Sequence, residues 1–381
     1  MKGLKKMNLN EKESLILKRI LKNPFVTQQE LADEIKLSRS ATANLISGLV
    51  RKEYLLGKAY VLNESKPVIC IGAANIDRRY LMEEPLIEGT TNDVKTQSTN
   101  GGVARSIAEN LGRLEVEAAL LSVVGNDPEW QKIKAASEHF MDVSAVDTLE
   151  GEATGAFMEV VNPNGDILFG LSDMEIYHCM TPEWLTKHLT LLKRSKYLVA
   201  DLNLPKETLE LLIALKMKHQ IPLVLITVSV PKMVNMPASL DGVDLLIVKH
   251  DETEAFLNLA VKSEEDAEQA AIKWLSYGAH SVIVTKNDDT LVYVADNGET
   301  IRYKNPHDIT NRYKWGANEA ICAGLIYARQ QGKSISQSLM AGFANGYYTT
   351  QSLSLVRSNL STLQLEKDIE ELAKVEKEYR V

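Results

Sequence analysis

The chain has 381 residues, 45% of them hydrophobic and 25% charged, which is typical of a folded globular protein and is enough for two or three domains. No apolar run approaches the ~20 residues that span a bilayer, and no apolar signal region follows the basic start, so we expect no membrane partner and a cytoplasmic location. Cys70, Cys179 and Cys322 lack any metal-type spacing and are expected to be packing thiols.

Charge is unevenly distributed along the chain. Residues 1–66 carry 13 Lys and Arg against 7 Asp and Glu, whereas the rest carries 30 against 44. A basic segment can approach nucleic acid, and an acidic one is repelled by it. Charge alone leaves nucleic-acid binding and a basic surface without function about equally favoured.

Residues 1–66 begin with two predicted helices. Leu15, Ile16, Ile20 and Leu21 recur at helical spacing and predict a first helix that ends near Asn23-Pro24, because proline cannot continue it. The tetrapeptide "TQQE" that follows is a capping box and predicts a second helix, with Leu31 and Ile35 facing inward.

A third helix and a hairpin complete this segment. Ser38 can cap the helix "RSATANLISGLVRK", in which Leu45, Leu49 and Val50 are expected to form the buried stripe. The stretch "EYLLGKAYVL" predicts a hairpin around Gly57-Lys58.

These elements resemble the winged helix-turn-helix family across residues 1–66, and "LSRSATANLISGL" is similar to a typical recognition-helix sequence of that family. The resemblance implies a DNA-binding domain whose third helix enters the major groove of duplex DNA. A winged helix used for protein contacts is the alternative. The resemblance implies that four residues of the third helix contact bases or phosphates, and that one residue of the wing, Lys58, contacts the DNA backbone. The four helix residues are Arg39, Ser40, Thr42 and Asn44.

From residue 67 onward, apolar strands alternate with helices: "PVICIGAANID", "EAALLSVVG", "SKYLVADLN", "IPLVLITVS", "GVDLLIVKHDE" and "HSVIVTKN". This alternation predicts an α/β fold with a mostly parallel sheet covered by helices on both faces. Two alternating segments around "NPNGD" interrupt it and predict a β-hairpin suited to be a lid over a small ligand.

Several separated stretches of residues 67–381 resemble the ribokinase-like (PfkB-type) sugar and nucleoside kinases, most closely the pseudouridine kinase branch. They are "GAANIDRRY", "NGGVARSIAENLGRLEVEAALLSVVGND", "DMEIYHCMTPEWL", "DLNLP", "VSVPK" and "GANEAICAG". The resemblance implies a ribokinase-like domain with a small β lid, a nucleoside or sugar ligand, and ATP and Mg²⁺ as cofactors if the domain is active, otherwise none.

The sugar-binding half of this family pattern is nearly intact. The resemblance implies that Asn75 and Asp77, at the end of the first strand, bind sugar hydroxyls, and that Gly101 and Gly102 let the backbone approach the sugar, with Arg105 nearby. Ser106 stands where the family usually has Asn. Asp77 could also be a solvated strand-end carboxylate beside Arg78.

The nucleotide-binding half departs from the family. Asp251 and Glu254 stand in place of an Asn-x-x-Glu pair that organises Mg²⁺ indirectly, through water. Thr285 of the nucleotide loop is retained, but Asn287 and Thr290 replace two glycines whose freedom lets a backbone approach the nucleotide closely.

The catalytic motif departs as well. The family pattern Asp-x-Thr-Gly-Ala-Gly-Asp supplies an anion hole and a base, whereas "DIT" at 308–310 is here separated from "GANE" by the extra residues "NRYKW". Gly316 and Ala317 remain, Asn318 replaces the second glycine, and Glu319 takes the base position. Glu319 could be a working base whose longer side chain the insertion compensates, or an ordinary acidic residue at a helix start.

The sequence therefore predicts a transcriptional regulator whose ribokinase-like domain senses a nucleoside or sugar and has impaired phosphotransfer. A kinase of pseudouridine or a related ribosyl compound is the alternative, and a pair of protein-interaction modules is a third reading. Winged-helix regulators usually dimerise on paired half-sites, so we expect a homodimer. The tail, with Leu365, Ile369 and Leu372 on one face, is predicted to cap the large domain rather than to join two subunits.

Overall fold

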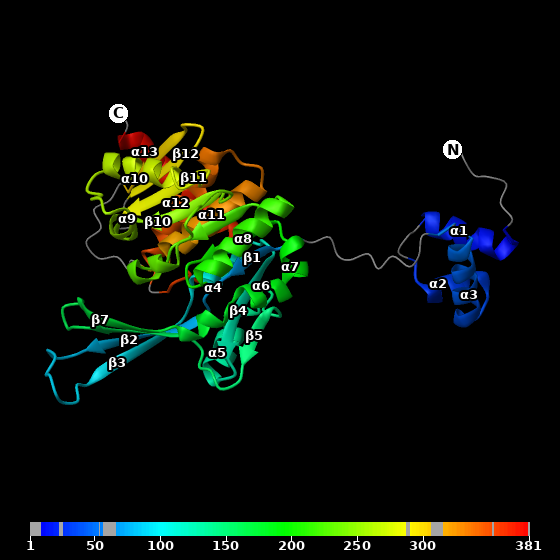
Figure 1. Cartoon of the computed structure of the whole chain (residues 1–381), viewed down its shortest axis with the longest axis horizontal. Coiled ribbons are helices and arrows are strands. Elements are labelled where there is room, and N and C mark those ends of the chain that lie inside the picture. The colour runs from blue at the N-terminus through cyan, green and yellow to red at the C-terminus, as the bar shows by residue number, and fades with distance from the viewer. Residues whose placement is uncertain are drawn as a thin grey trace. The chain divides into compact units, whose positions relative to one another are not determined.

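The computed structural model describes residues 9–22, 26–52, 54–55, 66–286, 290–305, 315–352 and 354–379. The chain divides into two compact units, Met1–Ser65 and Lys66–Val381 (Figure 1). Within the described ranges, every helix is too short or too polar to cross a membrane.

The first unit contains the three expected helices, α1 (Glu11–Lys22), α2 (Gln28–Ile35) and α3 (Arg39–Arg51). The capping box is confirmed, because Glu30 N–H donates to Thr27 Oγ1 (3.2 Å) and Thr27 N–H donates to Glu30 Oε2 (2.7 Å). Ser38 caps α3 by accepting from Ala41 N–H at 3.2 Å. The hairpin around Gly57-Lys58 lies outside the described residues.

The buried stripe of α3 differs from the predicted one. Thr42, Ile46 and Leu49 are buried, whereas Leu45 and Val50 are only partly buried. Residues 42, 46 and 49 are spaced as on one face of a helix. Thr42 therefore occupies a core position, which the prediction missed because it considered apolar residues only. Its hydroxyl is satisfied there, because it donates to Ser38 O at 3.1 Å.

The second unit is built on a nine-stranded sheet of order β13-β12-β11-β10-β9-β8-β1-β4-β5. All six predicted strands are present, and the seven strands from β11 to β5 run parallel. Three strands of this sheet were not predicted: β12 and β13, which pair antiparallel at one end of the sheet, and β5, which is the edge strand at the other end. The bounds are β1 (Val68–Ile71), β4 (Ala118–Gly125), β5 (Val146–Leu149), β8 (Tyr197–Asp201), β9 (Leu223–Ile226), β10 (Leu245–Lys249), β11 (Ser281–Lys286), β12 (Thr290–Ala295) and β13 (Thr300–Lys304).

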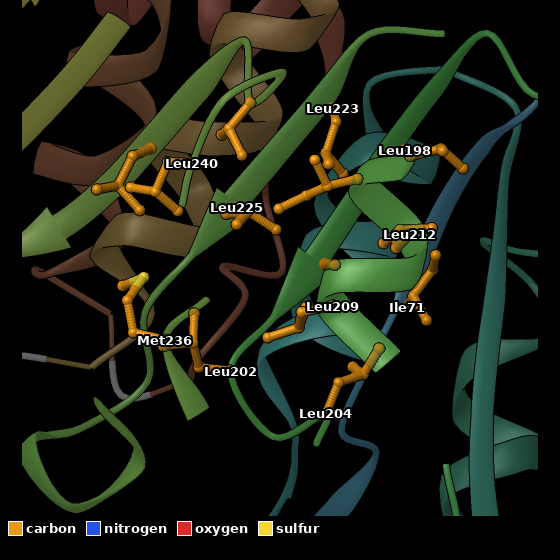
Figure 2. Packing of buried hydrophobic residues seen from close by; sticks show 14 of the residues in the cluster. Ile71, Leu198, Leu202, Leu204, Leu209, Leu212, Leu223, Leu225, Met236 and Leu240 are labelled. Atoms are coloured by element: carbon orange, nitrogen blue, oxygen red, sulfur yellow. The ribbon is translucent and has the colours of Figure 1, made fainter. Parts of the chain in front are cut away.

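Helices cover both faces of this sheet, as the alternation of strands and helices predicts. Alternate strand residues enter two separate cores: Ile69 and Ile71 of β1 join one, and Val68 and Cys70 join the other. Figure 2 shows part of the first core around a helix of this unit, α8. The helices are α4 (Val103–Arg113), α5 (Pro128–Ser137), α6 (Pro182–Lys187), α7 (Leu189–Lys193), α8 (Lys206–His219), α9 (His250–Leu257), α10 (Glu264–Leu275), α11 (Ala317–Gln330), α12 (Ile335–Thr349) and α13 (Thr362–Tyr379), with 3₁₀ turns η1 (Glu175–Cys179) and η2 (Val230–Asn235).

A second, four-stranded sheet of order β3-β2-β6-β7 projects from this body (Figure 1). Its strands are β2 (Asn75–Met82), β3 (Val94–Gly101), β6 (Ala156–Val161) and β7 (Ile167–Asp173). The predicted hairpin is confirmed, because β6 and β7 pair antiparallel around the "NPNGD" turn. We call this sheet the lid.

Two smaller expectations are also decided. Helix α13 caps the large unit, since Leu365 and Leu372 are buried in the second core. Cys70 and Cys322 are buried thiols as expected, but Cys179 is exposed and does not pack in a core.

Candidate functional site

A pocket lies between one face of the lid and two segments of the body. The lid contributes side chains from β2, β3 and β6, and the body contributes Trp315 and the stretch around Ser352–Leu355. The lining residues are Asp77, Arg78, Arg79, Gln97, Thr99, Phe157, Glu159, Trp315, Ser352, Ser354 and Leu355. This pocket contains Asp77, the residue that the sequence placed at the sugar.

The sequence predicts Asp77 at the end of the first body strand. In the structure it lies instead on the lid strand β2. Strand β1 already ends at Ile71, and Gly72 turns the chain with φ 147°, so the polar residues that follow start a new strand. Asn75 Nδ2 donates to Asp77 Oδ1 at 2.5 Å. Burial raises the pKa of Asp77 to about 7, although Asn75 and Arg105 oppose the shift.

The two glycines are required by close packing inside the site. A Cβ on Gly101 would lie 2.4 Å from the Asp77 carboxylate, and one on Gly102, whose φ is 95°, would lie 2.2 Å from Ala73 O. The absence of side chains at these two positions therefore leaves room for the Asp77 carboxylate and for the start of α4. This is compatible with the predicted place of both glycines beside a sugar.

Arg105 is buried, and its donors are committed to the protein. It donates to the carbonyls of Gly101 and Asn100, both at 2.7 Å, and to Glu109 Oε2 at 2.6 Å. Its contacts make it a positioning residue that fixes the end of β3 behind Asp77.

A second buried carboxylate holds the other side of the site together. Asp201, at the end of β8, accepts from the N–H groups of Ala73 (2.9 Å) and Ala104 (3.1 Å) through Oδ2 and from Asn203 N–H (2.9 Å) through Oδ1. A Cβ on Gly72 would collide with it. Asp201 therefore joins the turn after β1 to the first residues of α4 and fixes where the lid begins.

The anion-hole position lies at the start of α11. Gly316 adopts the left-handed conformation (φ 78°), and a Cβ there would lie 2.2 Å from Leu355 O. Ala317 and Asn318 are buried, and both Asn318 Oδ1 and Nδ2 lack a hydrogen-bond partner. A buried amide side chain without a partner among the described residues therefore stands at the predicted anion-hole position.

Glu319 follows in the same helical turn. Burial raises the pKa of its carboxyl, and the charge of Lys249 opposes this shift while that of Glu252 adds to it. Its own backbone N–H, one of the groups of the helix N-terminus, also opposes the rise of this pKa. Glu319 in turn contributes to the raised pKa of Asp77, so the base position and the sugar-side carboxylate are electrostatic neighbours.

The other nucleotide-side residues lie on the paired strands β11 and β12 and on helix α9, which follows β10. Thr285 lies one residue before the end of β11 and is buried, Thr290 starts β12, and Asn287 lies outside the described residues. Asp251 is exposed, whereas Glu254 accepts from Val261 N–H at 2.6 Å. Among the described residues, no group of three or more His, Cys, Asp or Glu is placed to hold a metal ion directly, so any role of this pair toward Mg²⁺ would be the indirect one.

In the first unit, helix α3 presents a polar face to solvent. Arg39, Ser40 and Asn44 are exposed, as DNA contact would require. Thr42 is fully buried, so it stabilises the entry of α3 and cannot contact DNA, which corrects its predicted role. Lys58 lies outside the described residues.

Comparison with protein families agrees with both parts of this description. The model described as "pfkB family carbohydrate kinase" matches residues 65–362, which is most of the chain. The chain belongs to the pfkB carbohydrate kinase family. A second model, described as "Winged helix-turn-helix DNA-binding", matches residues 9–55, so the pfkB domain follows a winged helix-turn-helix.

Individual relatives agree with this assignment. The chain is 28% identical to the uncharacterized sugar kinase YeiI of Escherichia coli over 93% of this chain and 97% of that protein. It is also 28% identical to the pseudouridine kinase of Escherichia coli, over 75% and 90%. Arabidopsis thaliana ribokinase, solved with ribose and ATP, shares the fold with a TM-score of 0.69 at 17% identity, over 80% of this chain and 99% of that one. The large unit is therefore a ribokinase-like pfkB domain.

The pocket of this pfkB domain includes residues that sequence reasoning did not select. Arg79, Phe157 and Glu159 lie on the same lid face as Asp77, and Trp315 faces them from the body. The period-two alternation of strands starting at Asp77 could have indicated Arg79. Trp315 carried no such signal, because it belongs to the insertion that separates the two halves of the family motif.

Proposed function

We propose that this protein is a DNA-binding transcriptional regulator whose pfkB domain binds a nucleoside or ribosyl ligand and has lost most of its phosphotransfer activity. The proposal includes action as a cytoplasmic homodimer on paired half-sites, as in many winged-helix regulators. ATP, if it binds, would supply the phosphoryl group, with Thr285, Gly316 and Ala317 beside it.

One asymmetry supports the proposal above all. The sugar side is well built, because Asn75 holds Asp77 and the glycines at 101 and 102 leave room for it. On the phosphate side, the buried amide of Asn318 has no partner at the start of α11. A buried polar side chain without a partner costs ~1–3 kcal/mol. In the proposal, its bulk at this position crowds the N–H groups that would stabilise a transferring phosphoryl group.

An active kinase of pseudouridine or a related ribosyl compound, using ATP and Mg²⁺, is the second candidate. The environment of Glu319 favours it, because a buried carboxyl with a raised pKa is suited to take a proton from a hydroxyl near neutral pH. The similarity to a pseudouridine kinase favours it as well.

Equilibrium binding tests the sensor proposal. We expect calorimetry of the full chain with ribose, uridine, pseudouridine and inosine to detect binding of at least one compound without ATP. That compound should also shift the affinity of the full chain for promoter-proximal DNA, measured by gel retardation at low salt. Absence of DNA retardation with and without each compound would contradict the regulator proposal.

A further inference from the structure

The lid face that holds Asp77 carries a second row of side chains, one step further along the strands. In the pairing register Asp77 lies beside Phe157 and Thr99, and Arg79 lies beside Glu159 and Gln97. Residues i and i+2 on a strand share a face and are about 6.6 Å apart. The pocket therefore has one row at the predicted sugar position and another where a substituent of that sugar would lie.

Glu159 is the unusual member of the second row. It is only 4% exposed, and its Oε1 is paired with Arg79 Nε. Its Oε2 is buried and has no hydrogen-bond partner among the described residues. A buried carboxylate oxygen without a donor is costly, so this atom is prepared to accept a hydrogen bond from something that enters the pocket.

Aromatic rings border the same row. The Trp315 ring lies 6.0 Å from Phe157, centroid to centroid and tilted by 50°, and Arg79 Cζ lies 5.9 Å from the Trp315 centroid. These two rings already contact each other, so a planar ligand would stack on an open face of the pair and not between them. Stacking on an aromatic side chain is available to every nucleobase, so these rings favour a base without selecting one.

We propose that the second row is a nucleobase subsite in which Glu159 accepts a hydrogen bond from a ring N–H of the base. This inference rests on the proposed function, since it requires a ribosyl ligand with its hydroxyls at Asp77. A carboxylate beside a guanidinium offers an acceptor next to donors and complements the N–H and C=O pair of uracil-type and hypoxanthine-type bases. The ligand class is thereby narrowed from sugars to nucleosides with a ring N–H beside a carbonyl.

Matched ligands test the inference on the full-length protein. Uridine and 3-methyluridine differ only in the ring N–H, as do inosine and 1-methylinosine, and calorimetry gives the dissociation constant of each. In the wild type we expect methylation to weaken binding by roughly 10–100-fold, the range for a lost hydrogen bond to a charged group. In Glu159→Gln the unmethylated nucleosides should bind more weakly, and the penalty for methylation should shrink several-fold.

The outcomes separate the two proposals. Binding of ribose and nucleosides with the same methylation penalty in wild type and Glu159→Gln would overturn the subsite and leave the proposed function intact. Failure of ribose and of all nucleosides to bind the wild type would overturn both. If Glu159→Gln does not fold, the wild type alone decides, because equal affinity for uridine and 3-methyluridine contradicts the inference. Trp315→Ala is a second variant and should weaken nucleosides but not ribose.

Discussion

Asp77, the proposed ligand of the sugar hydroxyls, is unfavourable for folding near neutral pH. Asp77 is partly buried between the lid and the body, and this burial raises its pKa to about 7, with the nearby carboxylates Glu159 and Glu319 adding to the shift. An unfolded chain would release this proton near pH 4. Between these two values the folded protein holds a proton that the unfolded chain has lost, so the stability contributed by Asp77 falls as the pH rises toward 7 and stays low above it.

Replacing Asp77 by Asn tests this account at the residue scale. We expect Asp77→Asn to raise the Tm at pH 8 and to change it much less at pH 4.5, which lies only slightly above the pKa of an unfolded aspartate, so that little stability has yet been lost. The same variant should bind ribosyl ligands more weakly, because an amide offers one acceptor where a carboxylate offers two. Differential scanning calorimetry at both pH values gives the first quantity.

Asp173→Asn is the matched control, because Asp173 is an exposed carboxylate on the same sheet. It should leave the Tm unchanged at both pH values. A Tm of Asp77→Asn that is lower than that of the wild type at pH 8 would contradict the description of Asp77 as a partly buried carboxylate with a raised pKa.

At the scale of elements, helix α3 packs into the core with one face and exposes the residues proposed to contact DNA on another. Its core face carries Thr42, Ile46 and Leu49, and its exposed face carries Ser40, Asn44 and the basic residue Arg39 at its start. Phosphate contacts by such a helix release counterions, so affinity for duplex DNA should fall steeply with salt.

We predict that Arg39→Ala weakens DNA binding by the full chain and lowers the salt dependence of log K by about one unit, as the loss of one phosphate contact does. Lys12→Ala removes the same charge from the exposed side of α1 and should change affinity much less. Fluorescence anisotropy with a promoter-proximal duplex at several salt concentrations measures both. Equal effects of the two variants would show that α3 is not the DNA-reading helix.

Prediction from the sequence succeeded where a strand is an apolar run buried on both faces or where a helix begins with a capping motif. The six predicted parallel strands and the caps at Thr27 and Ser38 were found in this way. Strand β3 was missed because "VKTQSTNG" is exposed along most of its length and carries no apolar period. Of the residues that line the pocket, Asp77 was selected from the family pattern, whereas Trp315 reaches the pocket only through the tertiary fold, which no local period encodes.

At the scale of the whole molecule, the chain joins a winged helix-turn-helix to a pfkB domain with an unequal site. The predicted sugar side keeps most of the family residues, with Ser106 in place of an asparagine, and the predicted phosphate side has Asn318 and Glu319 in place of glycine and aspartate. The added methylene of glutamate displaces a carboxylate by ~1.5 Å, and a misplacement of 1 Å can cost ~10²-fold in rate. Obstruction of the phosphate-binding N–H groups adds ~10²–10³-fold, so ligand binding without appreciable turnover is the expected behaviour.

The most direct test is ATP consumption by the full-length protein with Mg²⁺ and saturating pseudouridine, ribose or uridine. We predict no ligand-dependent turnover approaching ~1 per second, in a preparation that calorimetry shows to bind a nucleoside. Turnover in the ordinary enzyme range of ~1–10³ per second, abolished by Glu319→Gln, would contradict the account and establish Glu319 as a working base.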